Sequence, residues 1–537
     1  VALDLNTSWL FKIKCRCREA HVMKVTRWPA LLVFTALIFG GIISSTSEDL
    51  EEEAAGIGRV ISSAVGLESD LVSIWYCISG TVGGAGIADH EVILGNKSDK
   101  IAEVALTVTP VLAPQRNSSG DDQGRNKAAP EIIQIERIQT SIEIPARSVE
   151  TVVVANLPQV AGEFASVMLE SNVGDLIVEH RVVGDTGESQ SNCQSNASEE
   201  WYFASGTTRD QAREIISVFN PFADSAVVDM TFVADGRVRR PDSFSGLVIP
   251  PKTLLPVDIT GAVTLSDVVS AEVRARTGRV VAERLLIFGD EFTPNGLSIE
   301  AGSPSLAPIW VFPGGVDSTL PSSIQIFNPS EVEDVSVDIE IYSDFKDSSF
   351  IEPVSIEVSP GTTETIVLGG EEALNISRSA YDLTSRIPSG SPHWIVVRVI
   401  SGPSIVSERF VFSDGSFPQM TASGFGVDVM ADSHNFITSE GDELVAISHT
   451  SDDRLVQLKL LAFSGGELYQ SLPFEISAVS RKVINLEQFG IPADSVIELI
   501  SSEPVLVERY IGSSKGGYWT RVLPAASSLS EPYVPLQ

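Results

Sequence analysis

The sequence predicts an all-β protein: a tandem array of about four immunoglobulin-like β-sandwich domains after one N-terminal transmembrane helix. Three observations lead to this fold class: short alternating apolar runs between turns, three elements that recur four times in the same order, and one long uncharged stretch near the N-terminus. Runs rich in Val, Ile and Leu, with 41 Gly and 29 Pro scattered among them, favour many short strands over long helices. The length of 537 residues suits several domains rather than one core.

The first recurring element is an apolar strand that ends in an Asn or small polar turn and leads into an alternating strand. The turn residue allows the chain to bend, and the two-residue period after it places one face of the strand on a core. The element occupies residues 92–97, 216–221, 324–329 and 444–449. A second element, an Ile-Pro-like dipeptide before a polar turn, begins at Ile144, Ile249, Val358 and Ile476.

The third recurring element is a Glu that is followed by Arg in three of its four copies. The copies are Glu179, Glu283-Arg284, Glu408-Arg409 and Glu508-Arg509. Successive glutamates are 104, 125 and 100 residues apart, a spacing that matches sandwich domains of several short strands. A four-bladed propeller is the alternative, although its blades would be unusually long.

The N-terminal region predicts a membrane segment. Positive charge at Lys24 and Arg27 precedes an uncharged stretch at 28–47, and acidic residues follow at 48–53. About 20 uncharged residues can cross a bilayer, and this order of charge places the N-terminus inside and everything after residue 48 outside. We therefore expect a single-pass plasma-membrane protein. A cleaved signal peptide is the alternative, which would make the protein secreted, although no clear A-x-A site is present.

The expected domain organisation follows from these elements. The segments are 1–22, a cytoplasmic candidate for an overextended gene start before Met23; 23–47, a signal anchor or signal peptide; 48–72, an acidic linker; 73–195, 196–305 and 306–425, three sandwich repeats; and 426–537, a degenerate fourth repeat.

The charge is unevenly distributed. Residues 1–30 carry six basic and two acidic residues, which leaves a formal charge of −38 on the remainder of a chain whose total is −34. So acidic a surface repels phosphate backbones and argues against a nucleic-acid partner. Cys77 and Cys193 flank the first repeat and form a candidate disulfide, which suits an oxidising compartment.

Three repeats open on an aromatic signature. The openings are Trp75-Tyr76-Cys77, Trp201-Tyr202-Phe203-Ala204-Ser205-Gly206 and Trp310-Val311-Phe312. They resemble the W-Y-C and W-Y-F-A-x-G openings of an uncharacterised actinobacterial family of membrane-anchored or secreted proteins, classed as a domain of unknown function. The resemblance covers roughly residues 70–420 and implies an extracytoplasmic location and repeated β domains, but no activity and no catalytic residues. The fourth repeat departs from the pattern, since no aromatic-glycine opening precedes Leu444.

The sequence contains no recognisable catalytic motif. Its six histidines do not have metal-ligand spacing, and the G-x-S-x-G, H-E-x-x-H and Walker patterns are missing. We therefore expect no catalytic residues, no metal, no cofactor and no enzyme activity. The recurrent Glu remains to be explained: Glu283 shares a strand face with Val281 and Leu285, where a carboxylate is costly without a partner. We expect it to accept a hydrogen bond from a backbone amide or from the opening Trp indole of its own repeat.

These observations favour a non-catalytic, membrane-anchored envelope protein that acts as a scaffold, adhesion or assembly accessory. Its expected partners are the membrane, through the N-terminal helix, and an unidentified envelope protein or glycan. One alternative is an envelope carbohydrate-binding protein, which would need exposed aromatic platforms; Trp394 and Trp519 are the candidates. Another is a cryptic hydrolase or enzyme accessory, which would need convergent carboxylates.

Overall fold

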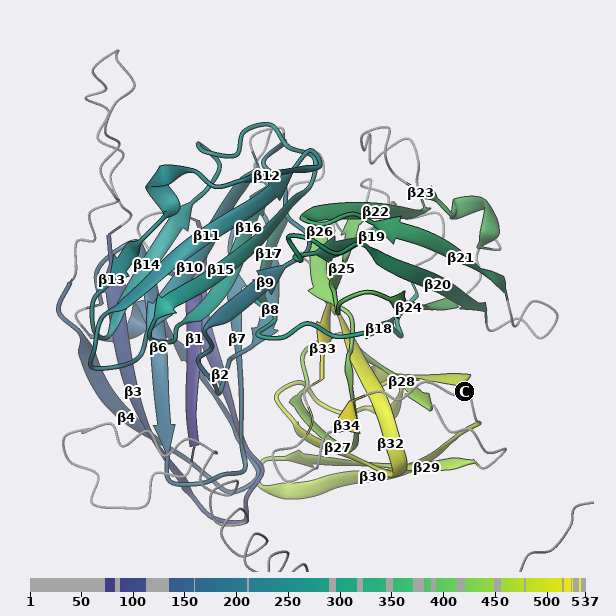
Figure 1. Cartoon of the computed structure of the whole chain (residues 1–537). Coiled ribbons are helices and arrows are strands. Elements are labelled where there is room, and N and C mark those ends of the chain that lie inside the picture. The colour runs from purple at the N-terminus through teal and green to yellow at the C-terminus, as the bar shows by residue number, and fades with distance from the viewer. Residues whose placement is uncertain are drawn as a thin grey trace, which may run out of the picture. The chain divides into compact units, whose positions relative to one another are not determined.

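The predicted all-β class is confirmed. The structure is a computed structural model in which Gly66–Gln537 form one compact unit. It describes residues 73–532 except 83–86, 113–134, 159, 210–211, 289–295, 316–321, 344–350, 370–380, 388–392, 413–420, 449–454, 478–479, 514–515, 523 and 525–530. Within that part, the chain forms several sheets of mainly antiparallel strands, and a few short 3-10 helices lie between strands (Figure 1). None of the helices among these residues is long and apolar enough to span a membrane, and the candidate span at 28–47 lies outside them.

Repeat 1 consists of two four-stranded sheets with one core between them. The strand orders are β1-β6-β3-β4 and β5-β2-β7-β8. The elements are β1 (Ser73–Thr81), β2 (Asp89–Asn96), β3 (Ala102–Val111), β4 (Ile138–Ile144), β5 (Val149–Val153), η1 (Val154–Asn156), β6 (Phe164–Ser171), β7 (Leu176–Val183) and β8 (Glu188–Asn192). Alternate side chains such as Val92 and Leu94 on β2 and Val104 and Leu106 on β3 fill this core, as the two-residue period predicts.

Repeats 2 and 3 follow the same plan. In repeat 2 the sheets are β12-β11-β15-β9, with β13 also on β11, and β14-β10-β16-β17; in repeat 3 they are β18-β24-β20-β21 and β23-β22-β19-β25-β26. Repeat 2 contains β9 (Glu200–Phe203), β10 (Arg213–Asn220), β11 (Ala226–Ala234), β12 (Arg237–Arg239), η3 (Asp242–Phe244), β13 (Leu247–Ile249), β14 (Thr253–Asp258), β15 (Val269–Thr277), β16 (Val281–Phe288) and β17 (Gly296–Ala301). Repeat 3 contains β18 (Ile309–Phe312), β19 (Ser322–Asn328), β20 (Val335–Ser343), β21 (Ile351–Val358), β22 (Thr362–Gly369), β23 (Tyr381–Asp382), η4 (Thr384–Arg386), β24 (His393–Ser401), β25 (Val406–Phe412) and β26 (Thr421–Phe425).

Repeat 4 merges its two sheets into one of eight strands. The long strand β32 (Val496–Ser513) pairs with β27 and β29 through its first half and with β28 and β33 through its second. The two halves of β32 therefore occupy the positions of two separate strands in each of the other repeats. The remaining elements are β27 (Val429–Ile437), β28 (Asp442–Ser448), β29 (Val456–Ser464), β30 (Glu467–Ile476), β31 (Ser480–Asn485), η5 (Glu487–Phe489), β33 (Gly516–Arg521) and β34 (Glu531–Pro532).

The strand order within a repeat differs from that of an immunoglobulin domain. The pairs β2–β5 and β3–β6 correspond to strands B–E and C–F, but the first strand lies beside β6 and the seventh beside β2. The first and seventh strands are thus exchanged between the two sheets. In repeat 1, β1 contacts β10 and β16 of repeat 2, whereas β2 and β7 contact β27 of repeat 4.

One asparagine links the first and second recurring elements inside each of repeats 1 to 3. Asn220 Nδ2 donates to the carbonyl oxygens of Asp224 (2.7 Å), Ile249 (3.0 Å) and Pro250 (3.2 Å), while its Oδ1 accepts from the Phe222 amide (3.0 Å). Asn96 and Asn328 make the equivalent contacts. All three are buried, so each side chain satisfies backbone groups that would otherwise lack partners.

We expect Asn328→Ala to lower the free energy of unfolding by about 1–3 kcal/mol, because it leaves buried carbonyls without a donor. Asn328→Asp should cost a similar amount, since it keeps the acceptor but loses the amide donor. Urea unfolding measures both. Asn196→Ala, at an exposed position, is the matched control. An Asn328→Ala variant as stable as this control would contradict the bridging role.

Candidate functional site

The recurrent Glu and the residue after it join neighbouring repeats. They lie on the equivalent strand of each repeat: β7, β16, β25 and the second half of β32. Because successive strand residues point to opposite faces, the Glu side chain reaches the preceding repeat and the next side chain reaches the following one. We call each such contact a joint and name it by the repeats that it connects.

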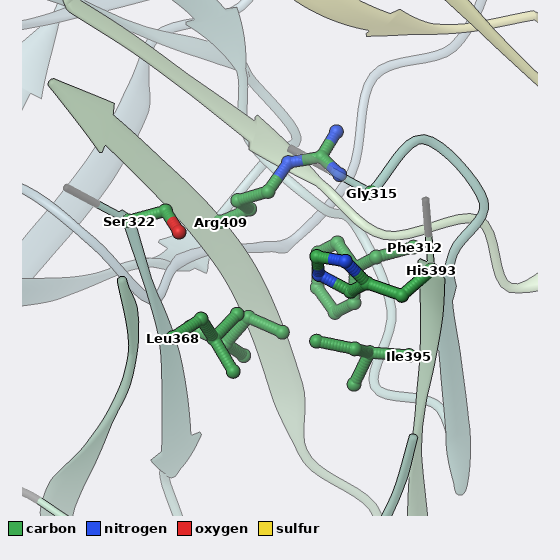
Figure 2. A pocket seen from close by; sticks show the side chains of 8 residues that line it. Phe312, Gly315, Ser322, Leu368, His393, Ile395 and Arg409 are labelled. Atoms are coloured by element: carbon green, nitrogen blue, oxygen red, sulfur yellow. The ribbon is translucent and has the colours of Figure 1, made fainter. Parts of the chain in front are cut away.

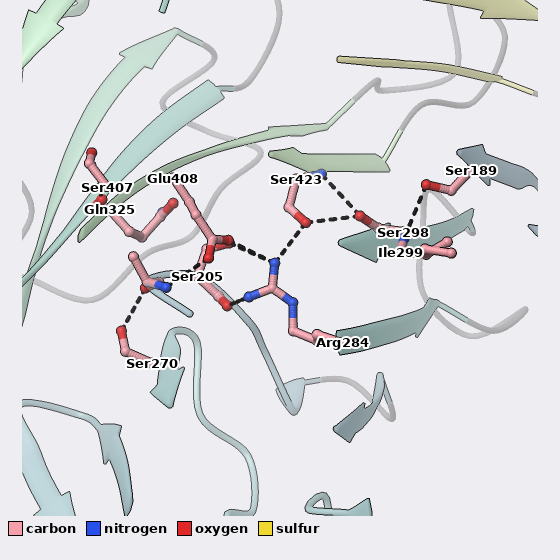
Figure 3. Close-up of polar contacts among 11 residues, drawn as sticks. Ser189, Ser205, Ser270, Arg284, Ser298, Ile299, Gln325, Ser407, Glu408 and Ser423 are labelled. Carbon is pink, nitrogen blue, oxygen red and sulfur yellow. Dashed lines mark hydrogen bonds and ion pairs between the residues drawn. The ribbon is translucent and has the colours of Figure 1, made fainter. Parts of the chain in front are cut away.

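Joint 2/3 shows the full arrangement (Figure 3). Glu408 Oε1 accepts from the Ala204 amide at 2.8 Å, and its Oε2 accepts from Arg284 Nη2 at 2.7 Å and from the Ser205 hydroxyl. Arg284 also donates to the Ser205 carbonyl and to Ser423 Oγ, the latter at 3.0 Å. Glu408 and Arg284 have no exposed side-chain surface. The opening strand of repeat 2 is therefore fastened to repeat 3 by a buried ion pair and a backbone amide.

Joint 3/4 repeats this geometry. Glu508 accepts from the Gly314 amide at 2.7 Å and from Arg409 Nη2 at 2.6 Å, while Arg409 Nη1 donates to the Gly314 carbonyl. Burial raises the pKa of Glu508 and lowers that of Arg409, and the contact between the two charges opposes both shifts. Each partner thus depends on the other to remain ionised inside the protein.

Joint 4/1 closes the circuit. Arg509 donates to both oxygens of Glu179, at 3.0 and 3.2 Å, although the two residues are 330 positions apart. The Ile437 amide of repeat 4 donates to the same carboxylate at 3.2 Å, and Gln190 Nε2 also donates to it. The last strands of the repeats, β8, β17, β26 and β33, form a second circuit in which each contacts the next and β33 contacts β8. The four repeats therefore form a ring rather than an open row.

Joint 1/2 uses histidine where the other three use arginine. Glu283 Oε2 accepts from the amides of Ile78 (3.1 Å) and Ser79 (2.9 Å), and its Oε1 lies 2.6 Å from His180 Nε2. Behind it, His180 Nδ1 lies 3.1 Å from His90 Nε2. Both histidines are fully buried.

Aromatic residues of the openings support the arginines. The guanidinium carbons of Arg284, Arg409 and Arg509 lie over the rings of Phe203, Phe312 and Phe436, at 5.4, 5.6 and 5.2 Å from the ring centroids. Repeat 1 has Cys77 at the phenylalanine position, and it is the repeat that has His180 in place of arginine. Aromatic ring and guanidinium are thus present or replaced together.

Two expectations about the polar residues need correction. The recurrent Glu does accept from a backbone amide, but that amide belongs to the preceding repeat, because the Glu points out of its own sandwich. The tryptophan indoles bond inside their own repeats instead, Trp201 to the Val280 carbonyl at 2.7 Å and Trp310 to the Ile405 carbonyl at 3.0 Å. Trp75 on β1 is half-buried.

Repeat 4 has an opening strand that sequence reasoning missed. His434-Asn435-Phe436-Ile437 on β27 occupies the position of the Trp-led openings, with Phe436 below Arg509 and the Ile437 amide on Glu179. The tryptophan is replaced by His434, so the aromatic-glycine pattern is lost while its structural role remains. Burial lowers the pKa of His434 to about 4. Of the aromatic opening signature, repeat 4 keeps only Phe436 in its sequence.

Other buried titratable groups cluster around joint 2/3. Burial raises the pKa of Glu214 and of Glu300 to about 8, against opposing attraction from Arg284 and, for Glu300, Arg521. Glu214 lies against the backbone of Gly206, where a Cβ would overlap its carboxyl group. Burial therefore favours the protonated, neutral form of both groups. Sequence reasoning did not single them out, because nothing in a linear pattern marks burial of a lone Glu.

A small pocket lies beside Arg409 in repeat 3 (Figure 2). Ser322, His393 and Phe312 are among its lining residues. Counted back from the turn asparagine, Ser322 holds the position that His90 and Glu214 hold in repeats 1 and 2. The pocket is therefore the space that a larger polar side chain fills in the first two repeats.

A disulfide joins Cys77 on β1 to Cys193, just after β8, with a Cα–Cα distance of 4.8 Å. It connects the first and last strands of repeat 1 and closes a separation of 116 residues. On the chain-entropy model a loop of this size stabilises by about 4–5 kcal/mol. Among the described residues no group of three or more His, Cys, Asp or Glu could hold a metal ion.

We expect Glu508→Gln to lower the free energy of unfolding by about 3–5 kcal/mol, because it leaves the Arg409 charge buried and uncompensated. Arg409→Met should cost a similar amount, and the double variant should cost less than the two single changes together, since they remove one interaction. Urea unfolding measures the cycle. Glu331→Gln, which breaks the exposed pair with Arg240, should cost under about 1 kcal/mol. Additive losses at the buried pair would show that Glu508 and Arg409 do not stabilise each other.

Glu214 predicts a pH-dependent stability. Its folded pKa, about 8, lies above the ordinary 4.5, so the folded state holds the proton more tightly than the unfolded chain. The stabilisation is complete below pH 4.5 and is lost as the pH rises through 8. Glu214→Gln, which does not titrate, should therefore gain about 4 kcal/mol over the parent at pH 8.5 and little at pH 4.5. Equal effects at both pH values, or the same profile for the exposed control Glu103→Gln, would contradict this assignment.

The comparison with protein families supports the expected resemblance in its coarse form. Residues 177–380 match the model of a family of unknown function (DUF5719). The match begins at the Glu179 strand and extends through repeat 2 into repeat 3. No curated protein matches the chain.

Proposed function

We propose that the protein is a non-catalytic, membrane-anchored component of the cell envelope, whose ring of four repeats acts outside the membrane as a scaffold, adhesion or assembly accessory. The observation that carries the proposal is the use of the recurrent charged residues. Glu179, Glu283, Glu408 and Glu508 are buried in joints, where their partners are amides, arginines and a histidine of neighbouring repeats. An active site would instead direct such groups into an accessible cleft.

The extracytoplasmic location has independent support. The Cys77–Cys193 disulfide suits an oxidising compartment. The charge order around residues 28–47 favours an N-terminus inside and the repeats outside. Both features agree with a chain that folds after export.

The carbohydrate-binding alternative loses one of its two aromatic candidates. Trp394 is 4% exposed and stacks on Tyr342, with 4.8 Å between ring centroids, beside residues of β27 and β32. It contributes to the packing between repeats 3 and 4 and offers no open platform. The side chain of Trp519 lies outside the described residues.

The hydrolase alternative rests on the raised pKa values of Glu214 and Glu300, since perturbed carboxyl groups are typical of acid–base sites. Both side chains are buried, with 0% and 5% of their surface exposed, so a substrate has no route to them in this arrangement. We therefore prefer the structural role.

Location and role can be tested separately on the full chain. Alkaline phosphatase, which is active outside the cytoplasm, should be active when fused after residue 537 and inactive when fused after residue 22. The opposite pattern would contradict the location. In-cell crosslinking should connect the repeats to an envelope protein or wall polymer, whereas specific binding on a glycan array would favour the carbohydrate alternative. Turnover of an envelope polymer that disappears in Glu214→Gln would overturn the non-catalytic role.

A further inference from the structure

We propose that joint 1/2 is controlled by a proton: the His90–His180 pair binds a proton to balance Glu283, and the joint loosens when that proton leaves to solvent. The other three joints hold a permanent guanidinium charge at the equivalent place. The proposal does not depend on the cellular role of the ring.

The geometry of the three side chains carries the argument. Glu283 Oε1 lies 2.6 Å from His180 Nε2, an ion-pair contact without hydrogen-bond geometry, and His180 Nδ1 lies 3.1 Å from His90 Nε2. An imidazolium can donate from both nitrogens at once, to the carboxylate on one side and to the neutral His90 on the other. In repeats 2 and 3 the arginine at this position contacts the carboxylate and, in place of a histidine, a backbone carbonyl, with a charge that pH does not remove.

In the proposed state, one of the two imidazoles of the pair is protonated to an imidazolium and the other stays neutral. Burial, together with the charge on His180, keeps the pKa of His90 well below its ordinary value. His90 is buried and packs against Gly80, where a Cβ would overlap its ring. One proton on the pair and one negative charge on Glu283 give a neutral joint, like the Arg409–Glu508 pair.

Loss of that proton weakens the joint without removing all its hydrogen bonds. Glu283 keeps the amides of Ile78 and Ser79, but its buried charge then has no counter-ion in the pair. The stabilisation is therefore present while the pair holds the proton and is lost as the pH rises and the proton leaves. Opening of the joint would expose the two amides on β1.

Among the neighbouring titratable groups, Glu170 needs a control variant to separate its effect between pH 5 and 7. On the strands packed against β2 and β7 they are Tyr76, Glu150, Glu188, Glu300, His434 and the exposed Glu143 and Asp432, with Glu170 on β6; on β2 and β7 themselves they are Asp89, Glu91, Glu179 and Arg181. Tyr76, Glu300 and His434 have pKa values of about 12, 8 and 4. Glu91 pairs with Arg181, and Glu179 with Arg509. Asp89 and Glu150 are exposed. Glu170 has a raised pKa, and an isosteric control separates its effect.

Hydrogen–deuterium exchange of the full-length protein tests the proposal. We expect the protection of the Ile78 and Ser79 amides, corrected for the intrinsic rate, to fall at least fivefold from pH 5 to pH 7. The Ala204 amide at joint 2/3 is the internal reference, because Arg284 stays charged and Glu214, with a pKa of about 8, keeps its proton in this range. Equal changes at the two joints, or none at Ile78, would overturn the proposal.

Variants identify the titrating group. His90→Ser with His180→Arg copies the Ser322–Arg409 combination of repeat 3, and we expect it to make protection at Ile78 independent of pH. His180→Gln keeps a neutral side chain that can hydrogen-bond, so that protection should stay low at both pH values even if the double variant folds poorly. Glu170→Gln should leave the parent's pH dependence unchanged. A His180→Gln protein with the parent's pH dependence would assign the effect to another group.

Discussion

The structure depends on the cost of burying a carboxylate that its own repeat does not neutralise. Each recurrent Glu leaves one sandwich without a cationic partner and finds an amide and a positively charged or imidazole side chain on the neighbour. Assembly of the repeats therefore buries a carboxylate, and this burial is tolerated only with the neighbour's partner in place, because an unpaired buried charge costs several kcal/mol. We infer that this requirement, more than the apolar surface between the repeats, specifies which repeat faces which. Because adjacent strand residues point to opposite faces, the Glu-Arg dipeptide directs a carboxylate toward one neighbouring repeat and a guanidinium toward the other.

The hydrophobic contacts supply the bulk of the stability, and the polar ones supply the register. Tyr76 and Phe219, with ring centroids 6.2 Å apart, belong to a continuous cluster that extends from repeat 1 through repeat 3. Such a surface would tolerate sliding of one sandwich over another, since apolar contacts have no direction. The charged pairs and amides have strict geometry, so they fix one position. The turn asparagines do the same inside a repeat by holding two distant turns together.

The sequence predicts the β class, which the structure confirms, but it does not reveal what the recurrent polar residues contact. Strict alternation around Val104 and Leu106 was enough to identify strands, because burial of one face leaves a local pattern. The partner of Glu408 is Arg284, 124 positions away, and no local pattern records such a contact. The assumption that a repeat satisfies its own polar groups led to the wrong donor for the Glu. The opening of repeat 4 was missed because His434 replaces tryptophan, whereas the function of that strand rests on backbone amides, which every residue type offers.

Closure between repeat 4 and repeat 1 has a consequence for how this architecture can evolve. Open solenoids gain and lose units freely and need polar caps at both ends, because their terminal units have a single neighbour. Here every unit has two neighbours, and Arg509 meets Glu179 only when the curvature of four units brings the chain back on itself. If one unit were duplicated or deleted, the last repeat would no longer reach the first, and Arg509 could not contact Glu179. Copy number is thereby held at four, while surface loops between the strands remain free to diverge.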